Sequence, residues 1–138
     1  MTLPTGPKIA VLPLANLSGN PDEEYFSDGL TEDIINRLTN FPNLTVFPRN
    51  ATAKYKGQEV EAATVGAELG AEYVVEGSVR RADGHLRVTM QMLDAVNGTN
   101  LWAKTYDRDL TAANIFEVQD AVTEGIVNSL GDYSGVIA

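Results

Sequence analysis

A short apolar run near the start of the chain is the feature that most constrains its fold. Residues 8–14, with the sequence KIAVLPL, are almost continuously apolar, and Pro13 marks the end of the run. Such a run is typical of a strand buried on both faces, which occurs in parallel sheets covered by crossover helices on each side. The run therefore predicts a central parallel strand in an α/β domain.

The segment after this strand has the signals of a crossover helix. Asn20 can cap a helix in which Pro21 takes the first position and Glu23 lies three residues after the cap. Apolar residues then recur at every fourth position: Phe26, Leu30, Ile34 and Leu38. Residues 40–42 end this helix, and residues 44–47 predict a second strand.

A second crossover follows in the same order. The apolar pattern favours a helix over residues 60–69, and Gly70 is placed to close it in the left-handed conformation. The small residues Gly66 and Gly70 on this helix predict close packing against the sheet. Tyr73 then begins a third strand. Two strand–helix–strand units imply right-handed parallel crossovers.

The organisation changes in the second half of the chain. The Asp-Gly dipeptide at 83–84 is a strong signal for a two-residue hairpin between strands at 73–81 and 86–94. A further turn, Asn-Gly at 97–98, leads to a strand at 101–106. These three strands are expected to form an antiparallel meander that extends the sheet.

A last amphipathic helix begins at Ile115 and is expected to stop at Gly131. Its apolar stripe consists of Ile115, Val118, Val122, Ile126 and Leu130. The expected order of elements is βαβαβββα, with a mixed five-stranded sheet. Residues 1–7 resemble a linker, residues 8–131 form a single domain of a size that can bury a core, and residues 132–138 form a tail.

Charge and composition exclude several classes of partner. Nineteen acidic residues against ten basic residues give a net charge of −9, which repels phosphate backbones and anionic membrane surfaces. Apolar runs such as residues 9–17 are far shorter than the roughly 20 residues that span a bilayer. The chain has no cysteine, which excludes disulfides and thiolate metal sites. We therefore expect no nucleic-acid partner and no membrane insertion by this segment.

The sequence contains no recognisable catalytic constellation. The one histidine, His85, follows the turn at 83–84 without a nucleophile motif beside it. The glycine-rich fingerprints of phosphate-binding loops are absent. Acidic residues at 22–28 and 107–109 lack the spacing of a calcium loop, which would need a glycine in place of Ala112. We therefore predict that the domain is not an enzyme and holds no cofactor or metal ion.

Two surfaces are candidates for binding. The loop after the first strand lies where open α/β sheets bind ligands, and it offers four residues: Asn16, Ser18, Gly19 and Asn20. Acidic residues at 22–24 would suit an uncharged or cationic ligand there, or would simply form an acidic helix start. The polar face of the meander offers six candidate interaction residues: Glu76, Arg80, Arg87, Gln91, Trp102 and Lys104. The alternative is a solvated sheet face with the aromatic rings turned onto a helix.

Strings along almost the whole chain resemble the TolB N-terminal-like domain of bacterial multidomain proteins. They lie at residues 9–13 (IAVLP), 16–19 (NLSG), 24–33 (EYFSDGLTED), 55–57 (YKG), 68–70 (ELG), 73–80 (YVVEGSVR), 101–103 (LWA) and 106–110 (YDRDL). In this family the domain accompanies class III adenylate cyclase domains, winged-helix domains or tetratricopeptide repeats. The resemblance implies a small α/β accessory domain, to which no catalytic residues carry over.

The resemblance also implies a function. It favours a sensory or protein-interaction role in a multidomain bacterial signalling protein, with a class III adenylate cyclase as the expected parent. The expected partners are the catalytic cyclase domain, tetratricopeptide repeats or envelope proteins. The family favours the periplasmic side of the envelope, with the cytoplasm as the alternative. A small-ligand receptor and a homodimerisation module are two other functions that the residues leave open.

Overall fold

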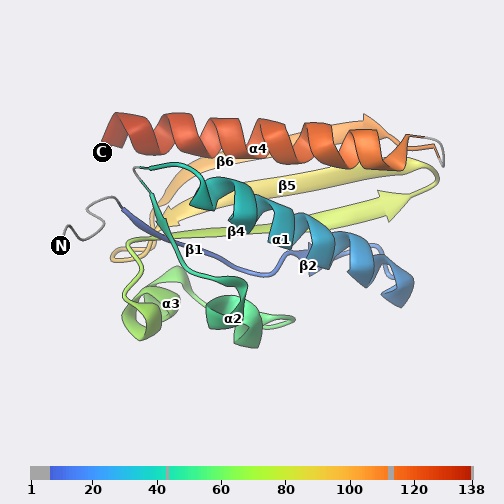
Figure 1. The fold of residues 1–138 in the computed structure, drawn as a ribbon. Coiled ribbons are helices and arrows are strands. Elements are labelled where there is room, and N and C mark those ends of the chain that lie inside the picture. The colour runs from blue at the N-terminus through green and yellow to red at the C-terminus, as the bar shows by residue number, and fades with distance from the viewer. Residues whose placement is uncertain (1–6, 43, 112–113, 138) are drawn as a thin grey trace.

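The computed structural model of the chain describes residues 7–42, 44–111 and 114–137, with side chains described as far as Asn128. Its centre is one mixed sheet with helices on both faces (Figure 1). The expected α/β class and the C-terminal helix are confirmed. Apart from Pro7, the linker-like start lies outside the described residues, as do the side chains of Leu130 and of residues 132–138.

The sheet has the strand order β3-β1-β4-β5-β6, and β2 pairs with β4 beyond the end of β1. Its strands are β1 Lys8–Val11, β2 Ala15–Asn16, β3 Thr45–Val46, β4 Tyr73–Ala82, β5 His85–Asp94 and β6 Asn100–Asp109. β1 is parallel to β3 and β4, whereas β4, β5 and β6 form an antiparallel meander. The expected parallel pairing and the meander are therefore confirmed.

Helices cover the sheet in two layers. They are α1 Glu24–Thr39, α2 Arg49–Thr52, α3 Ala62–Leu69 and α4 Ile115–Ile137, with 3₁₀ turns at Pro21–Glu23 and Ala53–Tyr55. α1 and α4 lie side by side on one face, and α2 and α3 lie on the other (Figure 1). The helical crossovers thus occupy opposite faces, as a strand buried on both sides requires.

The helix ends follow the expected signals, with two differences. Asn20 Oδ1 accepts a hydrogen bond from the Asp22 N–H (3.0 Å), but this cap precedes a 3₁₀ turn rather than α1 itself. Gly70 closes α3 with a φ of +77°, as expected. α4 continues past Gly131 to Ile137. An interior glycine costs a helix only about 1 kcal/mol, so a glycine alone does not stop it.

The strand β2 differs from the loop expected over residues 15–20. Pro13 has no N–H and interrupts the pairing with β4. The next N–H, that of Leu14, donates to Thr31 Oγ1 in α1 (3.0 Å), and the chain returns to β4 at Ala15. The proline thus divides one strand into β1 and β2, which gives the sheet six strands rather than five.

The sheet separates two hydrophobic cores. The larger core lies against α1 and α4 and includes Ile9, Val11, Leu30, Val79, Met90 and Ile126. The smaller core lies against α3 and includes Ala10, Leu12, Tyr55, Val65 and Val74. Alternate residues of β1 enter the two cores, which confirms that this strand is buried on both faces. A Cβ at Gly66 would lie 2.7 Å from Ala95 Cβ, so α3 packs closely at Gly66, just after the end of β5, whereas a Cβ at Gly70 would contact nothing within 4 Å.

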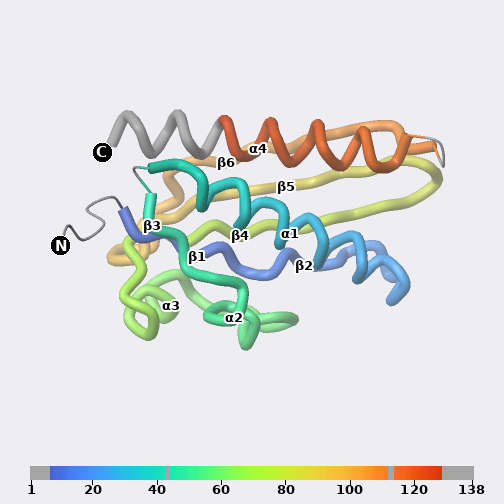
Figure 2. Tube along the Cα trace, in the orientation of Figure 1, coloured from blue at the N-terminus to red at the C-terminus, as the bar shows by residue number. Residues whose placement is uncertain are grey.

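The two helical layers leave part of one sheet face uncovered. α4 runs along the length of the long strands, whereas α2 and α3 lie below one end of the sheet only (Figures 1 and 2). The uncovered end presents even-numbered residues of β4 and odd-numbered residues of β5, which pair across the hairpin. We call the following residues the open face: Glu76, Ser78, Arg80, Arg87, Thr89 and Gln91.

Charged side chains connect β5 and β6 at the far end of this face. His85 Nε2 lies 3.2 Å from Asp107 Oδ1, and His85 Nδ1 lies 3.3 Å from Asp109 Oδ1. Arg87 Nε donates a hydrogen bond to Asp107 Oδ1 (2.8 Å). The hydrogen bond with Asp107, followed by that with Asp109, raises the pKa of His85 above its usual value of 6.5. His85 thus forms cross-strand contacts in this structure.

We predict that Gly77→Ala destabilises the domain by about 2–3 kcal/mol, because the added methyl group overpacks the core. A Cβ at Gly77 would fall against the Thr89 carbonyl oxygen and lie 2.5 Å from Met90 Sδ. Gly29→Ala is the matched control, since Gly29 lies inside α1 and its Cβ would be 3.6 Å from Nε2 of Gln119 in α4. That change should stabilise by about 0.5–1 kcal/mol. Urea unfolding measures both, and equal effects would contradict the prediction.

We also predict that the imidazole of His85 titrates with a midpoint above pH 6.5, because its carboxylate partners favour the charged ring. The contact of His85 with Asp107 and Asp109 stabilises the fold fully at pH values below the pKa of His85 in the unfolded chain. This stabilisation is lost as the pH rises through the pKa of His85 in the folded chain. Because His85 is the one histidine, proton NMR gives its titration without ambiguity. Asp107→Asn should move the midpoint down more than Asp109→Asn. A wild-type midpoint at or below 6.5 would contradict the assignment.

Candidate interaction surface

The loop residues expected to bind a ligand are engaged in local hydrogen bonds. Asn16 Oδ1 accepts from the Ser18 N–H (3.0 Å), and Asn16 Nδ2 donates to the Asn20 carbonyl (2.9 Å). Ser18 Oγ accepts from the Arg81 N–H in β4 (2.8 Å). Gly19 has a φ of +75°, which only glycine adopts without strain. These contacts fix the loop to the sheet, and ligand binding by the loop stays a prediction.

The structure divides the six residues expected to form one interaction surface. Glu76 pairs with Gln91, and Arg80 pairs with Arg87, so these four share the open face. Trp102 pairs with Met92 and Lys104 pairs with Met90, which places both on the opposite face, towards α4. The six residues therefore do not lie on one face, and an interaction role for them stays a prediction.

The aromatic residues of β6 explain this division. Tyr106 is buried, and its ring packs against α4 at Gly125, where a Cβ would lie 3.2 Å from Tyr106 Cε1. Trp102 packs against the same core, and Lys104 Nζ lies 5.1 Å from the centroid of the Tyr106 ring. Both rings therefore turn towards the larger core, as the alternative expected of them.

The open face carries a cationic pair at one end. Arg80 is exposed, and among the described residues its side chain has no hydrogen-bond or ion-pair partner. Arg87 lies directly opposite and is neutralised by Asp107. Like charges placed opposite each other on neighbouring strands are destabilising. Arg80 is therefore an uncompensated cation available to a partner.

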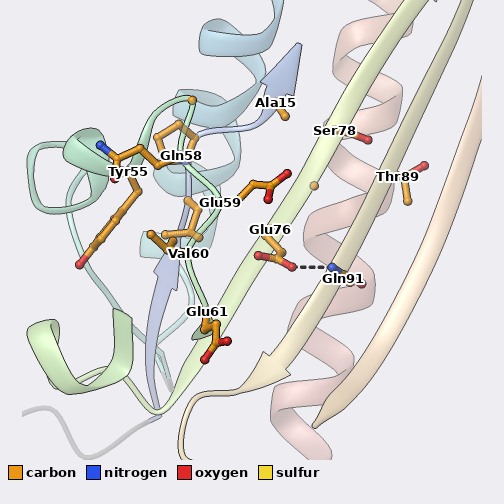
Figure 3. A pocket seen from close by; sticks show the side chains of 14 residues that line it. Ala15, Tyr55, Gln58, Glu59, Val60, Glu61, Glu76, Ser78, Thr89 and Gln91 are labelled. Carbon is orange, nitrogen blue, oxygen red and sulfur yellow. Dashed lines mark hydrogen bonds between the residues drawn. The ribbon is translucent and has the colours of Figure 1, made fainter. Parts of the chain in front are cut away.

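A groove of about 750 Å³ lies at the other end of the open face. Ala15, Glu76, Ser78, Thr89 and Gln91 line its sheet side (Figure 3). Tyr55 and residues 57–61, the segment between the second 3₁₀ turn and α3, form the facing wall (Figure 3). We call this cavity the groove. Its volume is within the range of ligand clefts, about 300–1,000 Å³, but much of its lining is polar.

Three carboxylates line the groove. Glu59 and Glu61 come from the wall and Glu76 from β4, and no lysine, arginine or histidine is among the lining residues. Glu76 Oε1 accepts a hydrogen bond from Gln91 Nε2 (2.5 Å). Within the described part of the chain, none of the three carboxylates forms an ion pair. The groove therefore has an uncompensated negative charge.

Sequence reasoning missed the wall of the groove. The expected helix over 60–69 begins only at Ala62, so residues 58–61 have no regular secondary structure, and Glu61 has an extended backbone. A signal was present, because glutamates at 59 and 61 flank Val60 with the spacing that puts two side chains on one side of an extended chain. Propensity alone does not distinguish this pattern from the first turn of a helix.

Lys56 holds the start of this wall against the rest of the domain. Its Nζ lies 2.7 Å from Glu24 Oε2 and 2.8 Å from Asp28 Oδ1, both in α1, and 3.3 Å from the Leu14 carbonyl oxygen. Partial burial lowers the pKa of Lys56, but the hydrogen bonds to Asp28 and Glu24 outweigh it, and the pKa is raised overall. The ammonium group thus stays charged and connects three segments.

Tyr55 fixes the wall to α3. Its hydroxyl donates a hydrogen bond to Glu68, and the ring is buried in the smaller core. Burial, followed by the hydrogen bond to Glu68, raises the pKa of Tyr55 to about 12. The phenol is therefore a structural donor at neutral pH.

The acidic residues considered for a metal site are separated in space. Glu24 and Asp28 bind Lys56, Glu23 binds Arg81 (3.0 Å), and the acidic residues of β6 lie beside His85. Across residues 7–42, 44–111 and 114–128, whose side chains the structure describes, no three histidine or acidic residues are placed to hold a metal ion. No helix of the described chain is long and apolar enough to cross a membrane.

A second, smaller cavity of about 180 Å³ lies at the carboxyl end of β1. Pro13, Thr31 and Lys56 are among its lining residues. Neither this cavity nor the groove is lined by the loop residues 16–20. Ala15, the first residue of the expected loop over 15–20, lines the groove, whereas the four residues expected to bind a ligand line neither cavity.

The fold occurs in several solved bacterial proteins. Lipoprotein GNA1162 of Neisseria meningitidis superposes with a TM-score of 0.68 at 15% identity, covering 91% of this chain and 99% of that protein. The PelC dodecamer of Paraburkholderia phytofirmans has a TM-score of 0.60 at 21% identity, covering 94% and 88%. TolB of Acinetobacter baumannii has a TM-score of 0.55 at 18% identity, covering 91% of this chain and 28% of TolB. The TM-scores show that these proteins share the fold of this chain, and at such low identities the likeness concerns the fold alone.

Sequence comparison finds a relative of higher identity and a matching family. "Putative adenylate cyclase 3" of Rhizobium meliloti (strain 1021) is 51% identical over 128 residues, which are 93% of this chain and 22% of that relative. The chain thus spans about a fifth of the curated relative that it matches. The family model for the second domain of HilA/YgeH-like transcriptional regulators matches residues 5–125. The chain therefore belongs to the family of HilA/YgeH-like transcriptional regulator second domains.

Proposed function

We propose that this chain is a non-catalytic interaction domain of a multidomain bacterial signalling protein with an adenylate cyclase-type parent. The observation that carries the proposal is the occurrence of one domain in two contexts. It is the second domain of a transcriptional regulator family, and it occupies 22% of a relative named as an adenylate cyclase. A domain shared by proteins with different outputs supplies a function that they have in common, which is neither DNA reading nor nucleotide cyclisation.

The surface of the domain supports this proposal. The open face combines an uncompensated arginine, Arg80, with an acidic groove, and complementary charge on a partner would fix both the orientation and the rate of association. The net charge of −9 disfavours DNA as that partner. A domain of the TolB N-terminal-like kind, which contacts another domain of its parent or an envelope protein, fits these features.

The test uses the full-length protein that contains this domain. Arg80→Glu should weaken the association of the domain with its partner about tenfold and alter the regulated output, while basal turnover of the parent is unchanged. Lys104→Glu is the matched control, because it makes the same change in charge on the face towards α4. Titration calorimetry and turnover assays measure the two effects. Turnover of ATP by the isolated 138-residue chain would overturn the proposal.

Self-association is a second candidate function. The structural relative PelC is a dodecamer, and within the described residues β6 pairs only with β5, which leaves its outer edge without a strand partner. Charged residues on β6 restrict which strands could add to that edge. A second copy of the domain would offer a matching edge.

We predict that, if this candidate is right, sedimentation equilibrium gives a mass above 14.9 kDa that rises with concentration. The expected cause is edge or face pairing of two copies, which mass action favours. A 14.9 kDa monomer at millimolar concentration would rule this candidate out and leave the first one untouched.

A further inference from the structure

We infer that the groove binds a basic segment of a partner protein in an extended conformation. This inference rests on the proposed function, since it names the chemistry of the partner that the interaction domain would contact. It is independent of Arg80, which lies at the other end of the open face. Charge, the spacing of the carboxylates and free backbone groups each support it.

Charge selects a cationic partner. The groove is lined by Glu59, Glu61 and Glu76 and by no basic residue. Several cations of the chain are already paired elsewhere: Lys56 with α1, Arg81 with Glu23, and Arg87 with Asp107. A lysine or arginine side chain entering the groove would therefore meet carboxylates that form no ion pair within the described residues.

The spacing of the carboxylates selects a chain rather than a single ion. Figure 3 shows Glu59, Glu76 and Glu61 at separate points along the groove, and no group of three described acidic residues is close enough to hold a metal ion. Three separated anions match cationic side chains presented in succession along an extended segment, in which alternate side chains point the same way. A single point charge would not satisfy all three carboxylates.

The rest of the lining suits the backbone and stems of such a segment. In the described chain, the backbone N–H and C=O groups of Glu59 and Val60 make no hydrogen bond, so an extended partner can pair with them as a strand would. Leu12, Pro13 and Val60 offer apolar contact to the methylene stems of lysine and arginine. The hydroxyls of Ser78 and Thr89 add hydrogen-bonding groups on the sheet side.

The test measures the binding of a fluorescein-labelled nonapeptide of alternating lysine and threonine to the 138-residue chain by fluorescence anisotropy. We expect binding that weakens as salt is raised to about 0.15 M, because exposed charges are screened. The variant E59Q/E61Q/E76Q keeps the shape of the groove and should bind about tenfold more weakly.

A matched variant controls for net charge. D22N/E117Q/E124Q also removes three negative charges, from exposed residues that do not line the groove, and should lower the affinity by less than about twofold. Thermal unfolding of both variants tests whether they are folded. A nonapeptide of alternating glutamate and threonine should not bind.

Four results would overturn the inference: no binding of the basic peptide, equal binding of the acidic peptide, equal losses in the two triple variants, or equally tight binding of free spermine. Equal losses would mean general charge attraction, and tight spermine binding would mean a polyamine site. If the peptide fails while Arg80→Glu still alters the parent, the groove assignment falls and the proposed function stands. If the peptide binds as expected while Arg80→Glu has no effect, the interaction role moves to the groove alone.

Discussion

The unequal lengths of the strands determine which faces of this domain are buried. β1 has four residues and β4 has ten, so at about 3.3 Å per residue they extend roughly 13 and 33 Å. α3 has eight residues and α4 has 23, which correspond to roughly 12 and 35 Å of helix. α4 can therefore cover the meander from end to end, whereas α3 matches only the part beside β1. The open face and the groove are consequences of this mismatch.

The acidic residues have two different roles because only some of them meet a cation. At the start of α1, Glu23 pairs with Arg81 and Glu24 pairs with Lys56. Exposed ion pairs contribute little stability individually, about 0–1 kcal/mol, so their main effect is to position the segments that they join. The three glutamates of the groove have no such cations among the described residues. These two carboxylates at the start of α1 are thus neutralised, whereas those beside the cavity form no ion pair.

The parts of the fold that could be predicted from the sequence are those set by local chemistry. The apolar run at 8–14 identified the central strand, and Gly70 closes its helix as expected. Asp83 and Gly84 both have positive φ, which is the conformation that the Asp-Gly hairpin signal requires. The segment at β2 could not be predicted, because its pairing depends on where the chain rejoins β4 after Pro13. α2, with four residues, is too short for a helical period to be visible.

The candidate site could be predicted only in part, for a related reason. Alternation shows which residues of one strand share a face. Which of the two faces is covered depends on helices that lie elsewhere in the sequence. Trp102 and Lys104 were therefore grouped with Arg80, although the register of β5 with β6 turns them towards α4. The irregular pairing at Met92 and Leu93 adds a further shift that alternation does not show.

The groove is favoured as a binding surface because its wall is held in place before any partner arrives. Lys56 anchors the start of the wall to α1, Tyr55 anchors it to Glu68, and Glu61 leads directly into α3. A preformed site loses little conformational entropy on binding, so more of the contact energy remains as affinity. Recognition of a basic extended segment requires no other particular structure in the parent protein. Such a domain can serve parents with different outputs, which is where relatives of this chain occur.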